Sequence, residues 1–380
     1  MLAPFGRRRF LQSSALTLGT SALTCTAMVR DAAGADVPRI EAPVVDRLVV
    51  QVVLDGAHDL FISGAQVPGI RVERTRLFAG RANRTLQSEW GLSLHLEAQA
   101  GAETRRYLLD FGYTPAALNE NIDLLNVDVA ALDGLILSHG HYDHMGGLAG
   151  FLQRHRARMK EDVPLYLGGE DAFCFRHIPA GNGAFAPFGM PPDRRALTEA
   201  RVRPVLSEAP LVIDRHAFTT GTVPRTSLER VLPNSFVEFG TRDGAGCDPA
   251  RYQDHHFTPS ELSGQPQPDQ HLHEHATCFH VRGRGLVLIT SCGHAGIINT
   301  VRRAQQVSGV EKVYALVGGF HLAPAPADYL RRVMTELKAL DIDHVFPMHC
   351  SGANFLEAAK QEMPQTLVLC TTGSRFTFGA

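Results

Sequence analysis

Four side chains that can bind a metal ion fall within six residues of this chain: His139, His141, Asp143 and His144. They follow an apolar segment, 131–137, that we expect to be a buried strand. Because alternate residues of a strand point to the same side, His139 and His141 can converge on one ion. The chain then turns and can present Asp143 and His144 to a second ion. Imidazole and carboxylate donors suit zinc, iron or manganese, so we expect one or two ions, with Zn²⁺ favoured and Mn²⁺, Fe²⁺ or Mg²⁺ as alternatives.

The composition is that of an ordinary globular protein, with 44% apolar and 20% charged residues. Its 37 Lys and Arg are balanced by 39 Asp and Glu, so a polyanion-binding surface is not indicated and nucleic acid is excluded as a partner. The 18 His are the unusual feature, and they gather around the motif described above.

The first residues resemble an export signal. An arginine pair is followed by Phe10-Leu11, as in the twin-arginine signal, and a weakly apolar stretch at 15–29 is too short to span a membrane. Ala33-Gly34-Ala35 offers a cleavage site. We therefore expect a signal peptide at 1–35, the twin-arginine translocase as a partner during export, and a periplasmic location. The alternative is a basic start on a cytosolic protein. The residues before Cys25 make a poor lipidation motif, so we expect no stable membrane anchor.

Six cysteines follow this segment without a CxxC pair, which argues against a zinc ribbon and leaves any disulfide pairing open. Apolar alternation predicts strands at 47–54, 91–97, 107–110, 131–137, 164–168, 277–282, 285–290, 313–317, 344–347, 366–371 and 375–378. Helical spacing predicts helices at 146–158, 297–307, 327–340 and 355–360.

Strands precede helices in both halves, which indicates an α+β fold of two mixed sheets face to face with helices outside. We expect a single domain over 36–380 with loop insertions near 177–195 and 241–270. The first insertion is rich in Gly, Pro and Phe, so it is either a lid over the site or a packed surface loop.

The HxHxDH run between a strand and Gly146-Gly147 resembles the signature of the metallo-β-lactamase superfamily, whose fold is an αβ/βα four-layer sandwich. Further stretches resemble one branch, named for 7,8-dihydropterin-6-methyl-4-(β-D-ribofuranosyl)aminobenzene 5′-phosphate synthase. They lie at 89–93, 109–112, 138–147, 291–297, 318–322 and 348–352. The resemblance spans about 45–372.

The resemblance implies that His139 and His141 bind the first ion and Asp143 and His144 the second, with His349 as the C-terminal histidine ligand. It also implies that Asp110 orients the ligands.

The chain departs from the family where a bridging Asp is expected, since Cys292 and His294 stand there. We choose His294 as the substitute ligand, while Cys292 either binds metal or lines the site. His271 and His275 compete for the third position on the first ion. His321 could donate a proton or bind an anionic group, so His321 and Cys292 are placed at the catalytic edge.

The function expected is hydrolysis of an ester, lactone or phosphoester of a small molecule by metal-activated water. One alternative is a synthase-type transfer that displaces a diphosphate. Another is a non-catalytic metal-binding or sensor protein. The substrate, the native metal and its stoichiometry, and the oligomeric state stay open.

Overall fold

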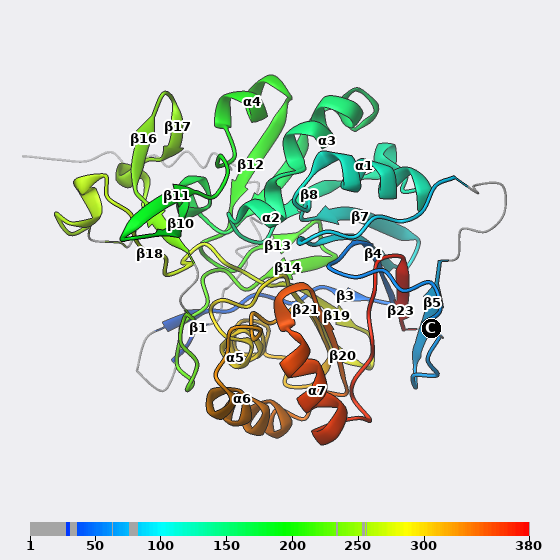
Figure 1. The fold of residues 1–380 in the computed structure, drawn as a ribbon. Helices are drawn as coiled ribbons and strands as arrows, with labels where there is room; N and C mark the ends of the chain where they lie inside the picture. The colour runs from blue at the N-terminus through cyan, green and yellow to red at the C-terminus, as the bar shows by residue number, and fades with distance from the viewer. Residues whose placement is uncertain are drawn as a thin grey trace, which may run out of the picture.

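The computed structural model describes residues 28–30, 36–62, 64–75, 83–232, 235–252, 255 and 257–379 (Figure 1). The twin-arginine motif and the expected cleavage site lie outside the described residues. The first described elements, β1 (Met28–Arg30) and β2 (Asp36–Pro38), pair antiparallel. Within the described part of the chain, no helix is long and apolar enough to cross a membrane.

The first large sheet has eight strands in the order β12-β9-β8-β7-β6-β4-β23-β5. Their bounds are β4 (Arg47–Leu54), β5 (Ile70–Arg74), β6 (Ser93–Ala100), β7 (Glu103–Leu109), β8 (Gly134–Leu137), β9 (Val163–Leu167), β12 (Val202–Leu206) and β23 (Ser374–Phe378). The strands β7, β8, β9 and β12 are parallel neighbours, whereas β4, β6 and β7 are antiparallel. The sheet is therefore mixed.

The second large sheet has the order β13-β14-β19-β20-β21-β22, and β3 pairs with β19 at its side. The bounds are β3 (Val44–Val45), β13 (Val212–Ile213), β14 (Ala217–Thr219), β19 (Thr277–Val281), β20 (Gly285–Thr290), β21 (Val313–Gly319) and β22 (His344–Met348). The strands β20, β21 and β22 are parallel.

The layers follow from strands that are buried on both faces. In β20, Val287 and Ile289 pack into the core between the sheets, while Leu286 and Leu288 pack under the helices outside. The helices α1 (Pro115–Leu124) and α3 (Leu148–His155) cover the first sheet. The helices α5 (Ile297–Ser308), α6 (Ala327–Ala339) and α7 (Ala353–Glu362) cover the second sheet. The predicted αβ/βα four-layer sandwich is confirmed.

The two insertions are more regular than the sequence indicates. Residues 177–195 contain most of a hairpin, β10 (Phe175–Gly181) and β11 (Ala184–Pro187), and then the start of α4 (Arg194–Glu199). The hairpin joins β15 (Phe236–Glu238) and β18 (Gln267–Pro268) in a four-stranded sheet. The interpretation of 177–195 as a loop is wrong for the hairpin, whose strands carry Pro179 and Pro187 at an edge and whose turn is formed by Asn182 and Gly183.

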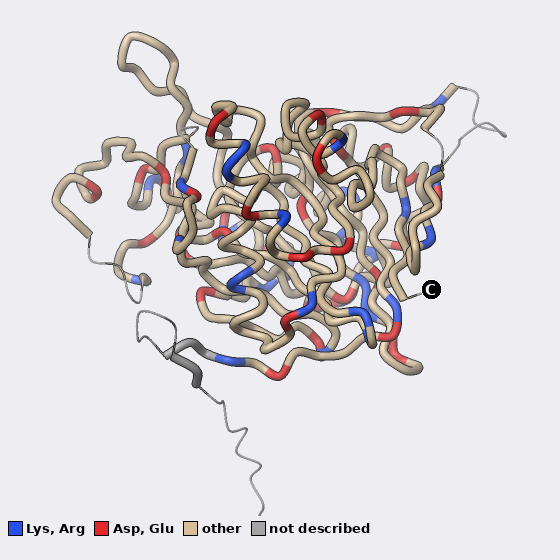
Figure 2. The backbone as a smooth tube through the Cα atoms, turned by 90° about the horizontal axis from the view of Figure 1, so that it is seen from below, with Lys and Arg blue, Asp and Glu red and all other residues tan. Residues whose placement is uncertain are grey.

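The second insertion, 241–270, contains a small hairpin of β16 (Gly240–Arg242) and β17 (Ala245–Cys247), two short 3₁₀ turns (Pro249–Arg251 and Glu261–Ser263) and β18. A disulfide between Cys174 and Cys247 fastens it to the residue just before β10. The strand predicted at 366–371 is also wrong, since only Leu367 makes an isolated bridge there, to Val345. Basic and acidic residues are mixed along the whole fold (Figure 2).

Candidate metal centre

The candidate ligands converge because they follow parallel strands in both large sheets. His139 and His141 come directly after β8, and Cys292 and His294 after β20. His349 comes directly after β22. Ligand sites in sheets of this kind form at the carboxyl ends of the strands. The sandwich therefore brings residues from positions 110 to 350 to one edge.

The predicted ligand-orienting residue, Asp110, is fully buried next to residues 138–144, which we call the ligand loop. Its carboxylate accepts hydrogen bonds from the backbone N–H and the hydroxyl of Ser138, both at 2.8 Å. It lies 2.7 Å from His144 Nδ1, which donates to it. This bond leaves Nε2 of His144 free to face the site as a ligand atom. Asp110 therefore fixes both the ligand loop and one ligand ring.

One set of donors has the spacing expected around a tetrahedral ion. The Nε2 atom of His349 lies 3.2 Å from Nε2 of His144 and 3.2 Å from Oδ2 of Asp143. The Sγ atom of Cys292 lies 3.2 Å from Nε2 of His144. Ligand atoms at zinc bonding distances are separated by about 3.3 to 3.8 Å in a tetrahedron. Asp143, His144, His349 and Cys292 therefore fit one ion.

A second set consists of His139, His141 and His294, whose ligand atoms lie within 4.8 Å of one another. The Nε2 atom of His139 and both ring nitrogens of His294 are buried without a hydrogen-bond partner. Unpaired buried nitrogens are costly, and an ion on this set would use the lone pair on one nitrogen of each ring. The two sets offer donors for two ions, whereas the motif predicted one or two.

Cys292 and His294, which stand where the family has a bridging Asp, occupy different positions in the centre. Cys292 forms one group with His139 and His144, one residue from each set, so its sulfur has the bridging position. His294 instead completes the second set, with His139 and His141. The geometry thus favours Cys292 over His294 as the substitute for the bridging Asp.

His271 and His275, the two candidates for the third ligand of the first ion, make different contacts. The ring of His271 stacks on that of His294, with centroids 4.0 Å apart, and forms a group with His141 and Asp269. The Nε2 atom of His275 instead donates to the backbone carbonyl of Leu137 at 3.2 Å. His271 is therefore the candidate that reaches the centre.

Four residues of the candidate site have strained backbone conformations. Asp110, His271, His321 and His349 all have positive φ angles, of 59°, 51°, 44° and 47°. Residues with side chains rarely adopt this region, and such strain gathers at functional sites.

The loop that carries Cys292 and His294 is held by two buried carboxyl groups. Glu274 accepts hydrogen bonds from the backbone N–H groups of His294 and Ala295 at 2.9 and 2.7 Å. Glu229 accepts from those of Ile298 and Asn299, in the first turn of α5. Burial raises the pKa of each carboxyl to about 7.

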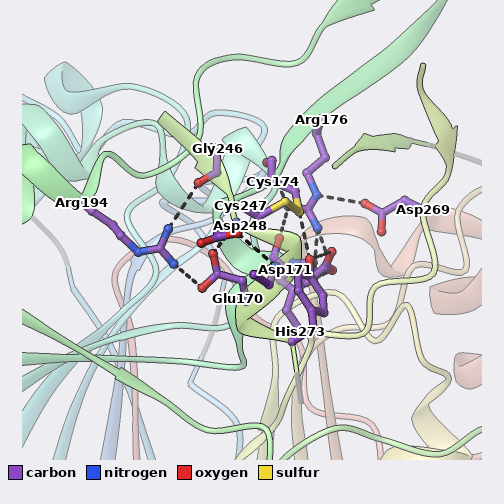
Figure 3. The surroundings of a disulfide bond; sticks show 12 residues. Glu170, Asp171, Cys174, Arg176, Arg194, Gly246, Cys247, Asp248, Asp269 and His273 are labelled. Atoms are coloured by element: carbon purple, nitrogen blue, oxygen red, sulfur yellow. Dashed lines mark hydrogen bonds and ion pairs between the residues drawn. A yellow bond between two sulfur atoms is a disulfide. The ribbon is translucent and has the colours of Figure 1, made fainter. Parts of the chain in front are cut away.

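A buried ionic network supports the ligand loop from the other side (Figure 3). His273 accepts from the backbone N–H of Gly140 at 2.6 Å and hydrogen-bonds Asp171 through its other nitrogen. The guanidinium of Arg176 binds Asp171 at 2.9 Å and Asp269 at 3.0 Å. Because each buried charge has an opposite partner, the network is satisfied. The network links Gly140, which lies between His139 and His141, to the segment around Cys174 that carries the disulfide.

The centre opens into a cavity of about 160 Å³. Its lining residues are Trp90, His141, Asp143, Ile178, Phe188, Ser235, Cys292, His294, His321, His349 and Cys350. The indole of Trp90 is 56% exposed and lies 4.9 Å from the ring of His349. Among the described lining residues there is no Lys or Arg.

Sequence reasoning missed Trp90, Ser235 and Cys350 as parts of this site. The position of Cys350 next to His349 was an available signal. Phe188 and Ile178, both in the insertion 177–195, line the cavity, which agrees with the expected alternative that this insertion covers the site. His321, which was predicted, lines the cavity with both ring nitrogens buried and without a hydrogen-bond partner.

Comparisons with known proteins agree with this geometry. Residues 100–222 match the model of the metallo-beta-lactamase superfamily. A solved structure described as Tm1679, a metal-dependent hydrolase of the beta-lactamase superfamily, is 20% identical. It superposes with a TM-score of 0.61 over 86% of this chain and 98% of its own, which shows the shared fold. The chain therefore has the metallo-β-lactamase fold, and residues 100–222 match the superfamily model.

Two curated relatives come from Methanocaldococcus jannaschii. The first is 7,8-dihydropterin-6-methyl-4-(beta-D-ribofuranosyl)-aminobenzene-5'-phosphate synthase, 22% identical over 303 residues, 74% of this chain and 88% of the relative. The second is the uncharacterized protein MJ0448, 27% identical over 257 residues, 68% of this chain and 83% of the relative. The chain therefore resembles the branch of the superfamily that the synthase represents.

The raised pKa of Glu229 predicts a pH-dependent stability. The folded carboxyl keeps its proton between about pH 4.5 and 7, where the unfolded one loses it, so its contribution to stability is lost as the pH rises through that window. Glu229→Gln removes the loss, and its stability relative to wild type should rise by up to about 1.4 kcal/mol per pH unit from pH 5 to 7. Urea unfolding at pH 5, 6, 7 and 8 measures this, with exposed Glu311→Gln as the control. A parallel pH dependence of wild type and Glu229→Gln would contradict it.

The ligand sets predict metal stoichiometry. His139→Ala and His294→Ala each remove a donor of the second set, so each variant should bind about one ion fewer than wild type, with unchanged far-UV circular dichroism. Metal analysis after gel filtration measures this. His280→Ala, on β19 and away from the centre, should bind as wild type does. Full metal content in His294→Ala would remove His294 from the ligand set.

Proposed function

We propose that this chain is a metal-dependent hydrolase of a small ester or lactone that carries an aromatic or apolar group. The observation that carries the proposal is the cavity over the converging donors, whose described lining has an apolar rim and no Lys or Arg. Phosphate groups are usually recognised by Arg and Lys. A substrate without a phosphate group suits this lining better, so we rank phosphoesters below carboxylic esters and lactones as substrates.

A bound divalent ion supplies Lewis-acid polarisation of the substrate and a water nucleophile at neutral pH. The protein's own part is to hold the substrate and manage protons. Burial alone would raise the pKa of Asp143, but neighbouring His144 and His349 hold it well below its usual value, so the carboxylate stays charged. His321 lines the cavity and is positioned to donate a proton to the leaving oxygen. The exposed face of Trp90 offers a stacking surface for a planar group.

A second candidate is transfer with displacement of a diphosphate. The observation that favours it is the similarity to the Methanocaldococcus synthase over 88% of that relative. A diphosphate would have to be bound here by metal ions and histidines. A non-catalytic metal-binding protein is the third candidate, and the absence of turnover on fully metal-loaded protein would select it.

The proposal predicts a substrate preference. Zinc-loaded protein should hydrolyse aryl esters and aromatic lactones with a kcat/KM well above that for bis(p-nitrophenyl) phosphate, which carries the same kind of ring. Loss of one aromatic contact is worth about 0.5 to 1.5 kcal/mol, so Trp90→Ala should raise KM for an aryl ester about 2- to 10-fold. KM for a small alkyl ester should change less. Exposed Leu262→Ala, outside the cavity lining, is the control. Preference for the phosphodiester, or for a pterin diphosphate in a parallel assay, would overturn the proposal.

We also propose that the chain is exported to the periplasm. The arginine pair before Phe10-Leu11 supports this, and so does the Cys174–Cys247 disulfide, because disulfides persist in oxidising compartments. Changing Arg7 and Arg8 to Lys should leave full-length precursor in the cytoplasm. Cell fractionation and immunoblotting of the bacterial host measure this. Undiminished mature protein in the periplasm would contradict the proposal.

A further inference from the structure

A second thiol lies beside the candidate metal centre. Cys350 follows β22 and is buried, and its Sγ atom lies 3.3 Å from Sγ of Cys292. Both thiols are free. Together with His349 they form a group whose ligand atoms all lie within 4.8 Å of one another. Cys350 was not among the residues expected to bind metal, and the four-residue set described above does not include it.

The spacing of the two sulfurs suits a shared ion. Sulfurs joined in a disulfide lie about 2.05 Å apart. Two thiolates on one tetrahedral zinc, each bonded at about 2.3 Å, lie about 3.8 Å apart. The observed 3.3 Å is nearer to the second value, so a small outward movement would place both sulfurs on one ion.

The protein is shaped to hold Cys350 in this position. The backbone N–H of His321 donates to its Sγ at 3.3 Å, which favours the charged thiolate that a metal requires. Gly319 leaves room for the sulfur, because a Cβ atom there would lie 2.9 Å from Sγ of Cys350 and 2.1 Å from the carbonyl of Ser291. Gly319 at the end of β21 and His321, two residues later, thus position the thiol beside Cys292 and His349.

We propose that Cys350 is a metal ligand, a fifth donor beside Asp143, His144, His349 and Cys292, and that with Cys292 it gives this ion a pair of sulfur donors. This pair selects a thiophilic ion such as Zn²⁺ over Mg²⁺ or Mn²⁺, because thiolates prefer softer metals. The inference deepens the proposed function, since it rests on the same metal centre, but it does not depend on the reaction.

The test uses the full chain, stripped by a chelator under reducing, oxygen-free conditions and then titrated with Co²⁺. Sulfur bonded to Co²⁺ gives a charge-transfer absorption in the near ultraviolet. Cys350→Ser and Cys292→Ser should each lose about half of this absorption, and the double variant all of it. Cys370→Ser, which changes a free thiol elsewhere, is the matched control and should keep the wild-type spectrum.

Metal competition gives a second readout. The Zn²⁺-over-Mn²⁺ affinity ratio of Cys350→Ser should fall at least about tenfold relative to wild type and Cys370→Ser. Cys350→Asp keeps a ligand without sulfur, so it should retain the ion while losing the same share of the absorption. This variant separates loss of a sulfur donor from loss of the fold, which circular dichroism monitors in each protein.

An unchanged Co²⁺ spectrum and affinity ratio in folded Cys350→Ser would overturn the proposal. So would a disulfide between Cys292 and Cys350 in metal-loaded protein, found by counting reactive thiols after denaturation. None of these readouts uses turnover. A protein with the two-sulfur signature but no esterase or lactonase activity would keep this inference and overturn the proposed reaction.

Discussion

The site depends on one buried carboxylate, that of Asp110. It stands at the end of β7, receives two hydrogen bonds from Ser138 and one from His144, and has no exposure to water. A buried charge is tolerated only when it is fully hydrogen-bonded. The ligand loop satisfies that requirement and is thereby fixed at the end of β8. The positive φ of Asp110 is the backbone cost of turning its side chain toward this loop.

Much of the fold could be predicted because its strands are short apolar runs bounded by turns, and most were found within a few residues of their bounds. The failures have physical causes. The hairpin of β10 and β11 is a mostly exposed edge with Pro179 and Pro187 in its strands, so the alternation of a core strand does not appear in 177–195. The run at 366–371 has strand composition, but the chain there makes a single bridge to Val345 instead of a ladder.

For the site, the local motif at 139–144 was readable because its ligands are close in sequence. The roles of Cys292, His294 and Cys350 were not, because they depend on how the ends of β20, β21 and β22 lie relative to one another. The different positions of His271 and His275 could not be predicted from the sequence either. They are four residues apart, and only the turn between them directs one toward His294 and the other toward the Leu137 carbonyl.

The place of β23 has a consequence for synthesis. This strand, formed by residues 374–378, lies between β4 and β5, with Phe376 opposite Val50 on one side and Val72 on the other. On the ribosome, β4 and β5 therefore lack the strand between them until residues 374–378 have been synthesised. Contacts between such distant segments form slowly because a long loop must be closed first. This part of the first sheet consequently cannot form in the order in which its strands are made, and its closure waits for a strand that lies far along the chain.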